Sequence, residues 1–221
     1  LAGRYHVVLA VIDGYGEAAD EPFVSIQESA EGLLAHIREA YGGHVFALGG
    51  LSLGAQIAVE ALAREPEVAT CAVIESALVH PLMGAKTLFA PMARMSYGLI
   101  RQRWFARLQA GALCLPDKLF DEYYRDSLRL RKDSLVNTLV SNGTYALPPA
   151  LAHARARVLV MAGDGEPAVM RKSARTLHEA IQGSELWIAH GMKHGELSLM
   201  HPQTYAEKLI AFFDGKAGAT A

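Results

Sequence analysis

Five short, continuous apolar runs divide this chain, and most are separated by stretches with helical periodicity. Apolar runs of four to eight residues that lack polar alternation are typical of strands buried on both faces. Strands that alternate with helices favour a parallel sheet with helices on both faces. The sequence therefore predicts an α/β fold, with strands at residues 7–12, 45–48, 68–74, 158–161 and 186–189.

The first helix is indicated by its ends as well as by its apolar face. Ser25 and Glu28 have the spacing of a capping box, in which each residue bonds the other's backbone N–H. Two glycines at positions 42 and 43 then supply a stop signal. The apolar residues between these signals share one helical face, namely Ile26, Ala30, Leu33, Leu34 and Ile37.

A GxSxG pentapeptide at residues 50–54 follows the second apolar run directly and opens a helical stretch. Alone it is a weak signal, because this composition would produce one by chance roughly one time in ten. Its position between a strand and a helix is that of a nucleophile elbow, a tight turn that exposes a serine. Ser52 is therefore the candidate nucleophile, against the plainer interpretation of a glycine-rich helix start that packs or binds an anion.

A serine hydroxyl needs a base, and the base needs a carboxylate that holds its tautomer. His194 lies in a glycine-containing loop just after the last apolar run, and is the predicted base. Two carboxylates, Asp164 and Glu166, follow the strand predicted at 158–161. We favour Glu166, because it lies farther from the strand end and has the longer side chain, and keep Asp164 as the alternative. A third possibility is Glu75, after the strand predicted at 68–74.

Between residues 80 and 149 the pattern changes to methionines and aromatic residues set among basic ones, with little strand signal. We interpret this span as a helical insertion within a single domain that occupies residues 1–221. Apolar residues in it predict a wall over Ser52 that suits an uncharged or acyl substrate. The alternative is that these residues only pack the insertion onto the sheet.

The bulk composition excludes several classes of protein. The formal net charge is −2, without the basic stripe that nucleic acid requires. No apolar run reaches the roughly 18 residues of a membrane span. Two cysteines without CxxC spacing favour packing thiols over a metal site or a disulfide framework. Unpaired thiols fit a reducing cytoplasm. The oligomeric state is left open.

Four segments together resemble the α/β-hydrolase superfamily: DGYGE at 13–17, GGLSLGAQ at 49–56, VLVMAGDGEP at 158–167 and GMKHGE at 191–196. The resemblance implies an α/β-hydrolase fold with a helical cap at residues 80–149, and no metal or cofactor. It also implies that the N–H of Leu53 lines the oxyanion hole. The superfamily's first strand and oxyanion loop have no counterpart here, so we expect the natural protein to extend further at its N-terminus.

The function expected from these observations is that of a carboxylesterase-like serine hydrolase, with a small-molecule ester or acyl compound as substrate. Ester cleavage through an acyl-enzyme is the superfamily's commonest chemistry. Amide or C–C cleavage and acyl transfer use the same residues and remain alternatives. A different class is a ligand sensor that keeps the triad without turnover.

Overall fold

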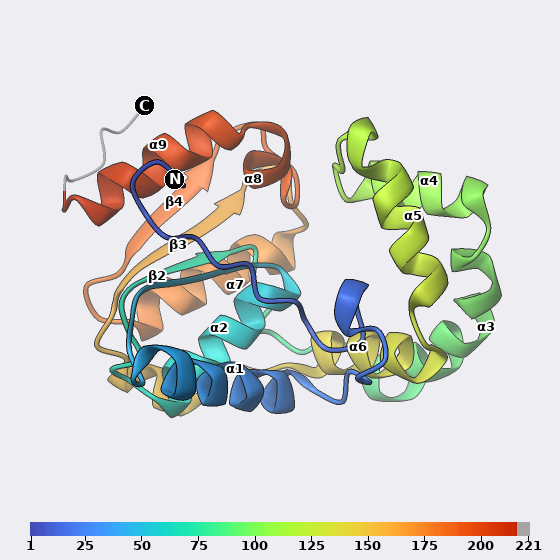
Figure 1. Cartoon of the computed structure of the whole chain (residues 1–221), viewed down its shortest axis with the longest axis horizontal. Coiled ribbons are helices and arrows are strands. Elements are labelled where there is room, and N and C mark those ends of the chain that lie inside the picture. Colours follow the sequence, from blue (N-terminus) through green and yellow to red (C-terminus); the bar gives the residue numbers. More distant parts are fainter. Residues whose placement is uncertain (216–221) are drawn as a thin grey trace.

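A computed structural model of the chain describes residues 1–215. Within that part, four strands form one sheet in the order β1-β2-β3-β4, and every neighbouring pair is parallel. All four carboxyl ends therefore lie at the same edge, as the arrows in Figure 1 show. The strands are β1 (Val45–Leu51), β2 (Ala69–Glu75), β3 (Arg157–Gly163) and β4 (Glu185–Ala189). They correspond to four of the five predicted strands.

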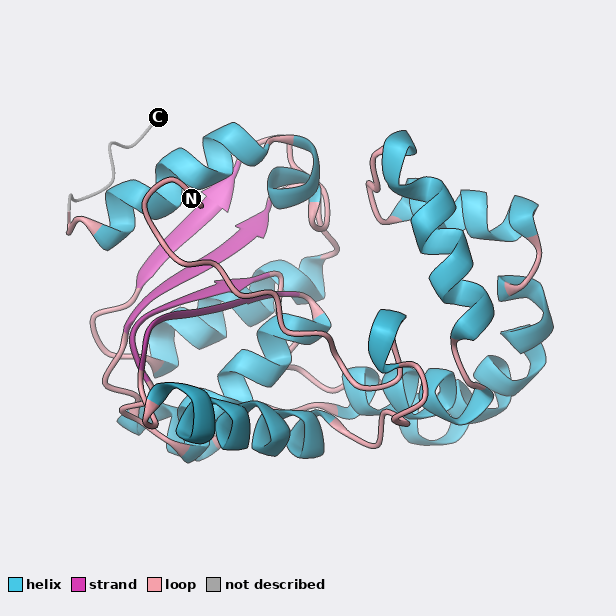
Figure 2. Ribbon diagram, in the orientation of Figure 1, coloured by secondary structure: helices cyan, strands magenta, loops and turns pink. Residues whose placement is uncertain are grey.

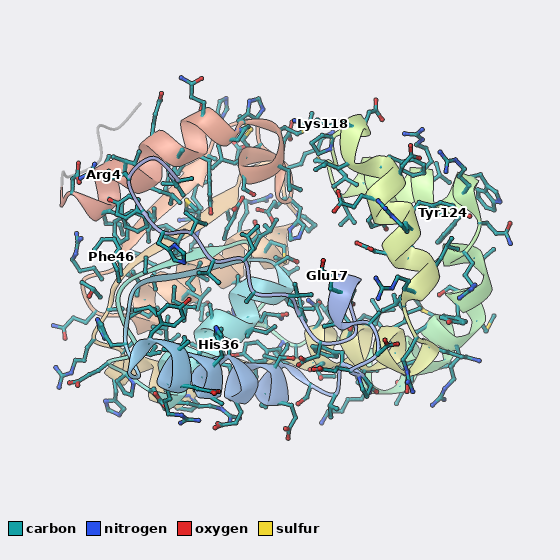
Figure 3. All side chains as sticks on the ribbon, in the orientation of Figure 1. Arg4, Glu17, His36, Phe46, Lys118 and Tyr124 are labelled. Atoms are coloured by element: carbon teal, nitrogen blue, oxygen red, sulfur yellow. The ribbon has the colours of Figure 1, made fainter. Side chains whose placement is uncertain are left out.

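The fifth prediction, a buried strand at residues 7–12, is wrong. This segment belongs to none of the described strands, and most of it is exposed, with Leu9 at 87%. A strand needs a neighbour for its backbone groups, and an apolar run cannot by itself indicate whether one is present. The residues before it do contact the body of the protein: the Tyr5 ring stacks on Phe46 of β1, and Arg4 pairs with Asp214. Arg4 and Phe46 are labelled in Figure 3.

Helices cover both faces of the sheet, as predicted for a parallel α/β fold (Figure 2). On one face, Leu34, Leu62 and Leu177 join the main core with alternate residues of the strands. These leucines come from α1 (Ile26–Tyr41), α2 (Leu53–Arg64) and α7 (Ala168–Ala180). On the other face, Leu209 and Phe212 of α9 (Pro202–Phe213) pack on the strand residues of opposite parity.

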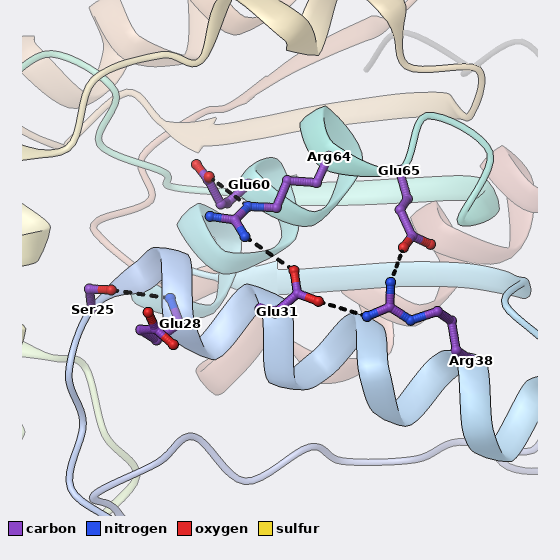
Figure 4. A network of polar contacts seen from close by, with 7 residues as sticks. All are labelled: Ser25, Glu28, Glu31, Arg38, Glu60, Arg64 and Glu65. Carbon is purple, nitrogen blue, oxygen red and sulfur yellow. Dashed lines mark hydrogen bonds and ion pairs between the residues drawn. The ribbon is translucent and has the colours of Figure 1, made fainter.

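The predicted ends of α1 are present in the structure. The Ser25 hydroxyl accepts a hydrogen bond from the Glu28 N–H at 3.1 Å, and Gly42 ends the helix in a left-handed conformation with φ of 66°. Beyond this cap, two arginines link α1 to α2 and the residue that follows it: Arg38 pairs with Glu31 and Glu65, and Arg64 pairs with Glu31 and Glu60 (Figure 4). Exposed pairs of this kind contribute about 0–1 kcal/mol each, so the apolar contacts dominate this interface.

The chain between β2 and β3 is helical in the structure. It contains α3 (Ala90–Ile100), α4 (Arg103–Ala112), α5 (Phe120–Arg129) and α6 (Lys132–Thr144), with shorter turns η2 (Ala85–Phe89) and η3 (Asp117–Leu119). Helices α3, α4 and α5 stand apart from the sheet, on the side of its carboxyl edge (Figure 1). Further short helices are η1 (Gly16–Ala18), η4 (Pro149–His153) and α8 (Glu196–Met200).

Two chain segments connect this helical span to the sheet, and they are hydrogen-bonded to each other. The Leu82 N–H donates to the Gly143 carbonyl at 2.8 Å, and the Leu147 N–H donates to the Val79 carbonyl at 3.2 Å. The fully buried amide of Gln56 on α2 donates to carbonyls of both segments. The helix that follows Ser52 is therefore tied directly to the base of the insertion.

No helix within residues 1–215 combines the length and the apolar character needed to cross a bilayer.

Candidate active site

Ser52 occupies the tight turn between β1 and α2. Its backbone has φ of 56° and ψ of −114°, a region that residues other than glycine rarely adopt. The turn is held because the Ser52 N–H donates to the Glu75 carbonyl on the neighbouring strand at 2.9 Å. Backbone strain at a strand-to-helix turn is the property that presents a nucleophilic side chain above a sheet.

The two glycines of the GxSxG motif have different roles in this turn. A Cβ atom on Gly50 would lie 2.3 Å from the carbonyl of Gly54, which is closer than atoms can approach. A Cβ atom on Gly54 would meet nothing within 4 Å. Only the first glycine is therefore required sterically by the turn.

His194 lies between Ser52 and Glu166 and is within hydrogen-bond distance of both. Its Nε2 atom is 3.0 Å from the Ser52 hydroxyl, and its Nδ1 atom is 2.8 Å from a Glu166 carboxylate oxygen. The loop that carries His194 connects β4 to α8. It turns at Gly195, where φ is 68° and a Cβ atom would press on the Leu51 side chain.

The Glu166 carboxylate has no solvent-exposed side-chain surface, and three donors surround it. Besides His194, the Gly163 N–H and the Ser76 hydroxyl each donate to its other oxygen at 2.7 Å. Burial by itself raises the pKa of a carboxyl group, but here the three hydrogen bonds prevail and lower the pKa of Glu166. The group is therefore ionised at neutral pH and can hold an imidazole in one tautomer.

Asp164, the alternative acid, is engaged elsewhere. Its two oxygens accept hydrogen bonds from the His190 Nδ1 atom and the Gly191 N–H, both at 2.7 Å. The bond to His190, followed by the bond to the Gly191 N–H, lowers the pKa of Asp164. Asp164 therefore shapes the loop before His194, and both of its side-chain bonds go to residues of that loop other than His194.

Glu75 lies close to the same residues but is not bonded to His194. It is 3% exposed at the end of β2, and burial is the largest effect raising its pKa. Sequence reasoning missed its neighbour Ser76, which is 2% exposed and bonds Glu166. The one available signal was the position of Ser76 directly after a predicted strand, and serines in such positions are common.

Leu53 is the first residue of α2, so its N–H lies in the first helical turn, where no carbonyl of the same helix can accept it. This places an available donor beside Ser52. Within the described residues, no group of three His, Cys, Asp or Glu side chains is arranged to hold a metal ion.

The apolar residues of the insertion divide into two groups. Met83, Met95 and Trp104 are 98%, 83% and 60% exposed, so they do not pack the helices onto the sheet. Phe120 is buried in a small separate cluster with residues of α4 and α5. Two surface cavities of about 620 and 1100 Å³ lie elsewhere: the first between α3 and α6, the second at the amino edge of the sheet.

Cys114 lies in the turn after α4 and is half-buried. Burial raises the pKa of the Cys114 thiol, with a further contribution from the negative charge of Glu196 and an opposing one from Lys193.

Solved structures with the same fold include two esterases and a bromoperoxidase. A thermophilic esterase from Thermogutta terrifontis has a TM-score of 0.71 at 13% identity, over 94% of this chain and 79% of the other. An esterase from Exiguobacterium antarcticum has a TM-score of 0.73 at 16% identity, over 92% and 79%. A bromoperoxidase from Bacillus anthracis has a TM-score of 0.74 at 15% identity, over 91% and 79%.

No curated protein matches the sequence significantly. The model of the alpha/beta hydrolase family, however, matches residues 1–208, which is nearly the whole chain. The family model and the fold agree with the resemblance found in the four sequence segments. The chain therefore belongs to the alpha/beta hydrolase family.

Proposed function

We propose that this protein is a carboxylesterase-like serine hydrolase whose catalytic triad is Ser52, His194 and Glu166. One observation carries the proposal: His194 bridges the Ser52 hydroxyl and the Glu166 carboxylate at 3.0 and 2.8 Å. Nucleophile, base and orienting acid in this order are the arrangement that activates a serine.

The proposed reaction has two halves. His194 takes the hydroxyl proton of Ser52 as its oxygen attacks the ester carbonyl carbon, and then gives the proton to the alcohol as the ester C–O bond breaks. Water next loses a proton to His194 and attacks the acyl-enzyme, which releases the carboxylic acid and restores the Ser52 hydroxyl. Glu166 keeps the imidazole oriented and stabilises its protonated form in both halves.

The negative charge that develops on the carbonyl oxygen needs donors. We assign one of them to the N–H of Leu53, because the start of α2 leaves this group without an acceptor in its own helix. The partial positive charge at the N-terminus of that helix acts in the same direction.

In this proposal, residues 80–149 form a cap that selects the substrate. The hydrogen-bonded base of the insertion supports this assignment, as does the effect of the Glu196 and Lys193 charges on the pKa of the Cys114 thiol. Its exposed methionines and Trp104 supply apolar surface for a small or apolar acyl group.

The substrate is thus a small-molecule ester, and the mechanism uses no metal, cofactor or nucleic acid. The free thiols of Cys71 and Cys114 support a reducing cytoplasm as its location.

The similarity to two esterases favours ester cleavage at the level of the fold. Amide cleavage, C–C cleavage, acyl transfer and ligand sensing without turnover are distinguished by experiment. A panel of chromogenic esters with increasing acyl length, together with amide and C–C substrates, measures turnover. A fluorophosphonate probe measures whether Ser52 is activated.

Ser52→Ala should abolish both labelling and ester turnover while the protein stays folded, because it removes one hydroxyl and no core volume. Ser184→Ala, at the residue before β4 where the hydroxyl bonds His178, is the matched control outside the proposed cap and should keep both. Ester turnover that survives in purified Ser52→Ala would refute the mechanism. Labelling of the wild type without turnover of any substrate would favour the sensor.

A further inference from the structure

Glu75, the last residue of β2, and Ser76, which follows it, point in different directions. Side chains alternate along a strand, so Glu75 has the same parity as Cys71 and Val73, whose face is covered by α9. Ser76, the next residue, reaches Glu166 instead. Ser76 therefore supports the carboxylate that bonds the Nδ1 atom of His194, whereas Glu75 faces the opposite side of the sheet.

Glu75 has contacts to both the nucleophile turn and the histidine loop. Its carbonyl accepts the Ser52 N–H at 2.9 Å. Its Oε1 atom accepts from the Ser198 hydroxyl at 3.1 Å, and Ser198 lies on α8, four residues after His194. The same hydroxyl is 3.3 Å from the Gly195 carbonyl, so it lies against the backbone next to His194.

We propose that Glu75, in its protonated form, is a positioning residue that fixes the His194 loop to the strand end beneath Ser52 through Ser198. The inference rests on the proposed serine-hydrolase function and adds a residue that the triad does not include. It assigns different protonation states to two neighbouring buried carboxyl groups, with Glu75 neutral and Glu166 ionised.

The surroundings of Glu75 favour the neutral form. Its Oε2 atom is buried and has no hydrogen-bond partner among the described residues, whereas the carboxylate of Glu166 has three donors. No arginine or lysine in the described part of the chain forms an ion pair with it. A buried carboxylate without such partners gains a proton instead of paying the cost of desolvation.

The titratable groups around Glu75 come from the loop after β3, the loop after β4 and helix α9. Burial raises the pKa of Glu75 most, and the negative charge of Glu166 raises it further, while the Ser198 bond and His194 oppose the shift. From α9, Tyr205 faces the same carboxyl group, and its own pKa is raised by burial and by Glu75. When two carboxyl groups in one site have pKa values shifted in opposite directions, they usually have different roles in that site.

The test measures the rate constant for fluorophosphonate labelling of Ser52 as a function of pH. Glu75→Gln keeps an oxygen for Ser198 and stays neutral, so it should label within about threefold of the wild type, with its acid limb at the same pH. Glu75→Leu keeps the volume but loses the contact, and should label at least about tenfold more slowly, since small displacements of a base are costly. Ser198→Ala should also slow labelling.

Three results would overturn the inference. If Glu75→Gln labels as slowly as Glu75→Leu, the negative charge is what matters. An acid limb that moves to lower pH in Glu75→Gln would mean that Glu75 is ionised beside His194 in the wild type. Unchanged labelling in Ser198→Ala would show that the contact positions nothing, and this variant remains informative if Glu75→Leu does not fold.

Glu60→Gln serves as the control for removing a buried carboxyl group. Glu60 lies in the second half of α2, where it bonds Arg64 and Tyr145, and its substitution should leave the pH profile of labelling unchanged. Failure of the proposed function looks different from failure of this inference, because a wild type that does not label at Ser52 at any pH would refute the triad itself.

Discussion

The carboxylate of Glu166 shows how single residues set the chemistry of this site. Three donors from three parts of the chain meet it: the His194 ring, the Gly163 N–H and the Ser76 hydroxyl. An isolated buried charge costs several kcal/mol, and charge-assisted hydrogen bonds offset that cost. Glu75 accepts from the Ser198 hydroxyl but keeps one buried oxygen without a partner among the described residues, and its pKa shifts in the opposite direction. The unpartnered oxygen distinguishes Glu75 from Glu166.

At the residue scale, replacing a carboxylate by its amide distinguishes the roles of Glu166 and Asp164, the two acids that follow β3. Glu166→Gln should lower kcat/KM on the order of 10⁴-fold, the usual cost of losing a triad acid, because the amide cannot hold the reactive tautomer of His194. Asp164→Asn is the matched control and should cost far less, because Asp164 bonds His190 and Gly191. A large loss confined to Asp164→Asn would reverse the assignment.

At the scale of elements, the junction of β1 and α2 is the most constrained place in the fold. Strand β1 continues to Leu51, three residues beyond its predicted end, so Ser52 follows the last strand residue directly. The chain then reverses its direction within one residue, which brings the Gly50 Cα close to the backbone at Gly54. This contact explains why one glycine of the motif cannot carry a side chain.

Alanine substitutions at Gly50 and Gly54 should therefore have different effects on the free energy of unfolding. Gly50→Ala places a methyl group within 2.3 Å of backbone atoms and should lower the free energy of unfolding by more than about 2 kcal/mol. Gly54→Ala enters open space in the first turn of α2 and should be neutral or stabilising by up to about 1 kcal/mol. Urea denaturation measures both, and similar losses in the two variants would contradict this account of the turn.

At the scale of the whole molecule, the structure divides its packing between the sheet and the helical insertion. The sheet has a main core on one face and a smaller core under α9 on the other. The insertion has its own small cluster around Phe120, and is tied to the sheet body near Gln56. Ser52 follows the carboxyl end of β1 and His194 lies in the loop after β4. The insertion stands on this side of the sheet (Figure 1).

Global stability should depend on pH through the two buried carboxyl groups, with opposite signs. The pKa of Glu166 is lowered in the folded chain, so its contribution is present above the ordinary glutamate pKa of about 4.3 and is lost as pH falls through the folded value. The difference in unfolding free energy between the wild type and Glu166→Gln should shrink in that range. Denaturant titrations from neutral pH downward measure it, and a pH-independent difference would contradict the shift.

Glu75→Gln is the counterpart in this experiment. Because the pKa of Glu75 is raised in the folded chain, its neutral form stabilises the fold at low pH, and that contribution is lost as pH rises through the folded value. The variant cannot ionise, so it should gain stability relative to the wild type as pH rises. If Glu75→Gln instead gained stability relative to the wild type as pH falls, the pKa of Glu75 would be lowered in the folded chain, not raised.

Local patterns in the sequence predicted the parts of this protein that depend on local physics. Four apolar runs became the four strands, and the signals at Ser25 and Gly42 became the ends of α1. The spacing of the GxSxG motif placed Ser52 between a strand and a helix. The run at residues 7–12 has the same apolar character and forms no strand, because pairing depends on a neighbour that the run itself does not encode.

What only the tertiary structure decided is how distant residues meet. The sequence by itself determined the α/β class and nominated Ser52, His194 and two acids, since strand and turn signals act over a few residues. Which acid faces His194 was decided by the turn after β3, which leads Asp164 to His190 and Glu166 to the imidazole. The contributions of Ser76 and Glu75 were likewise decided there, because parallel pairing of β2 with β1 and β3 brings their side chains to this edge.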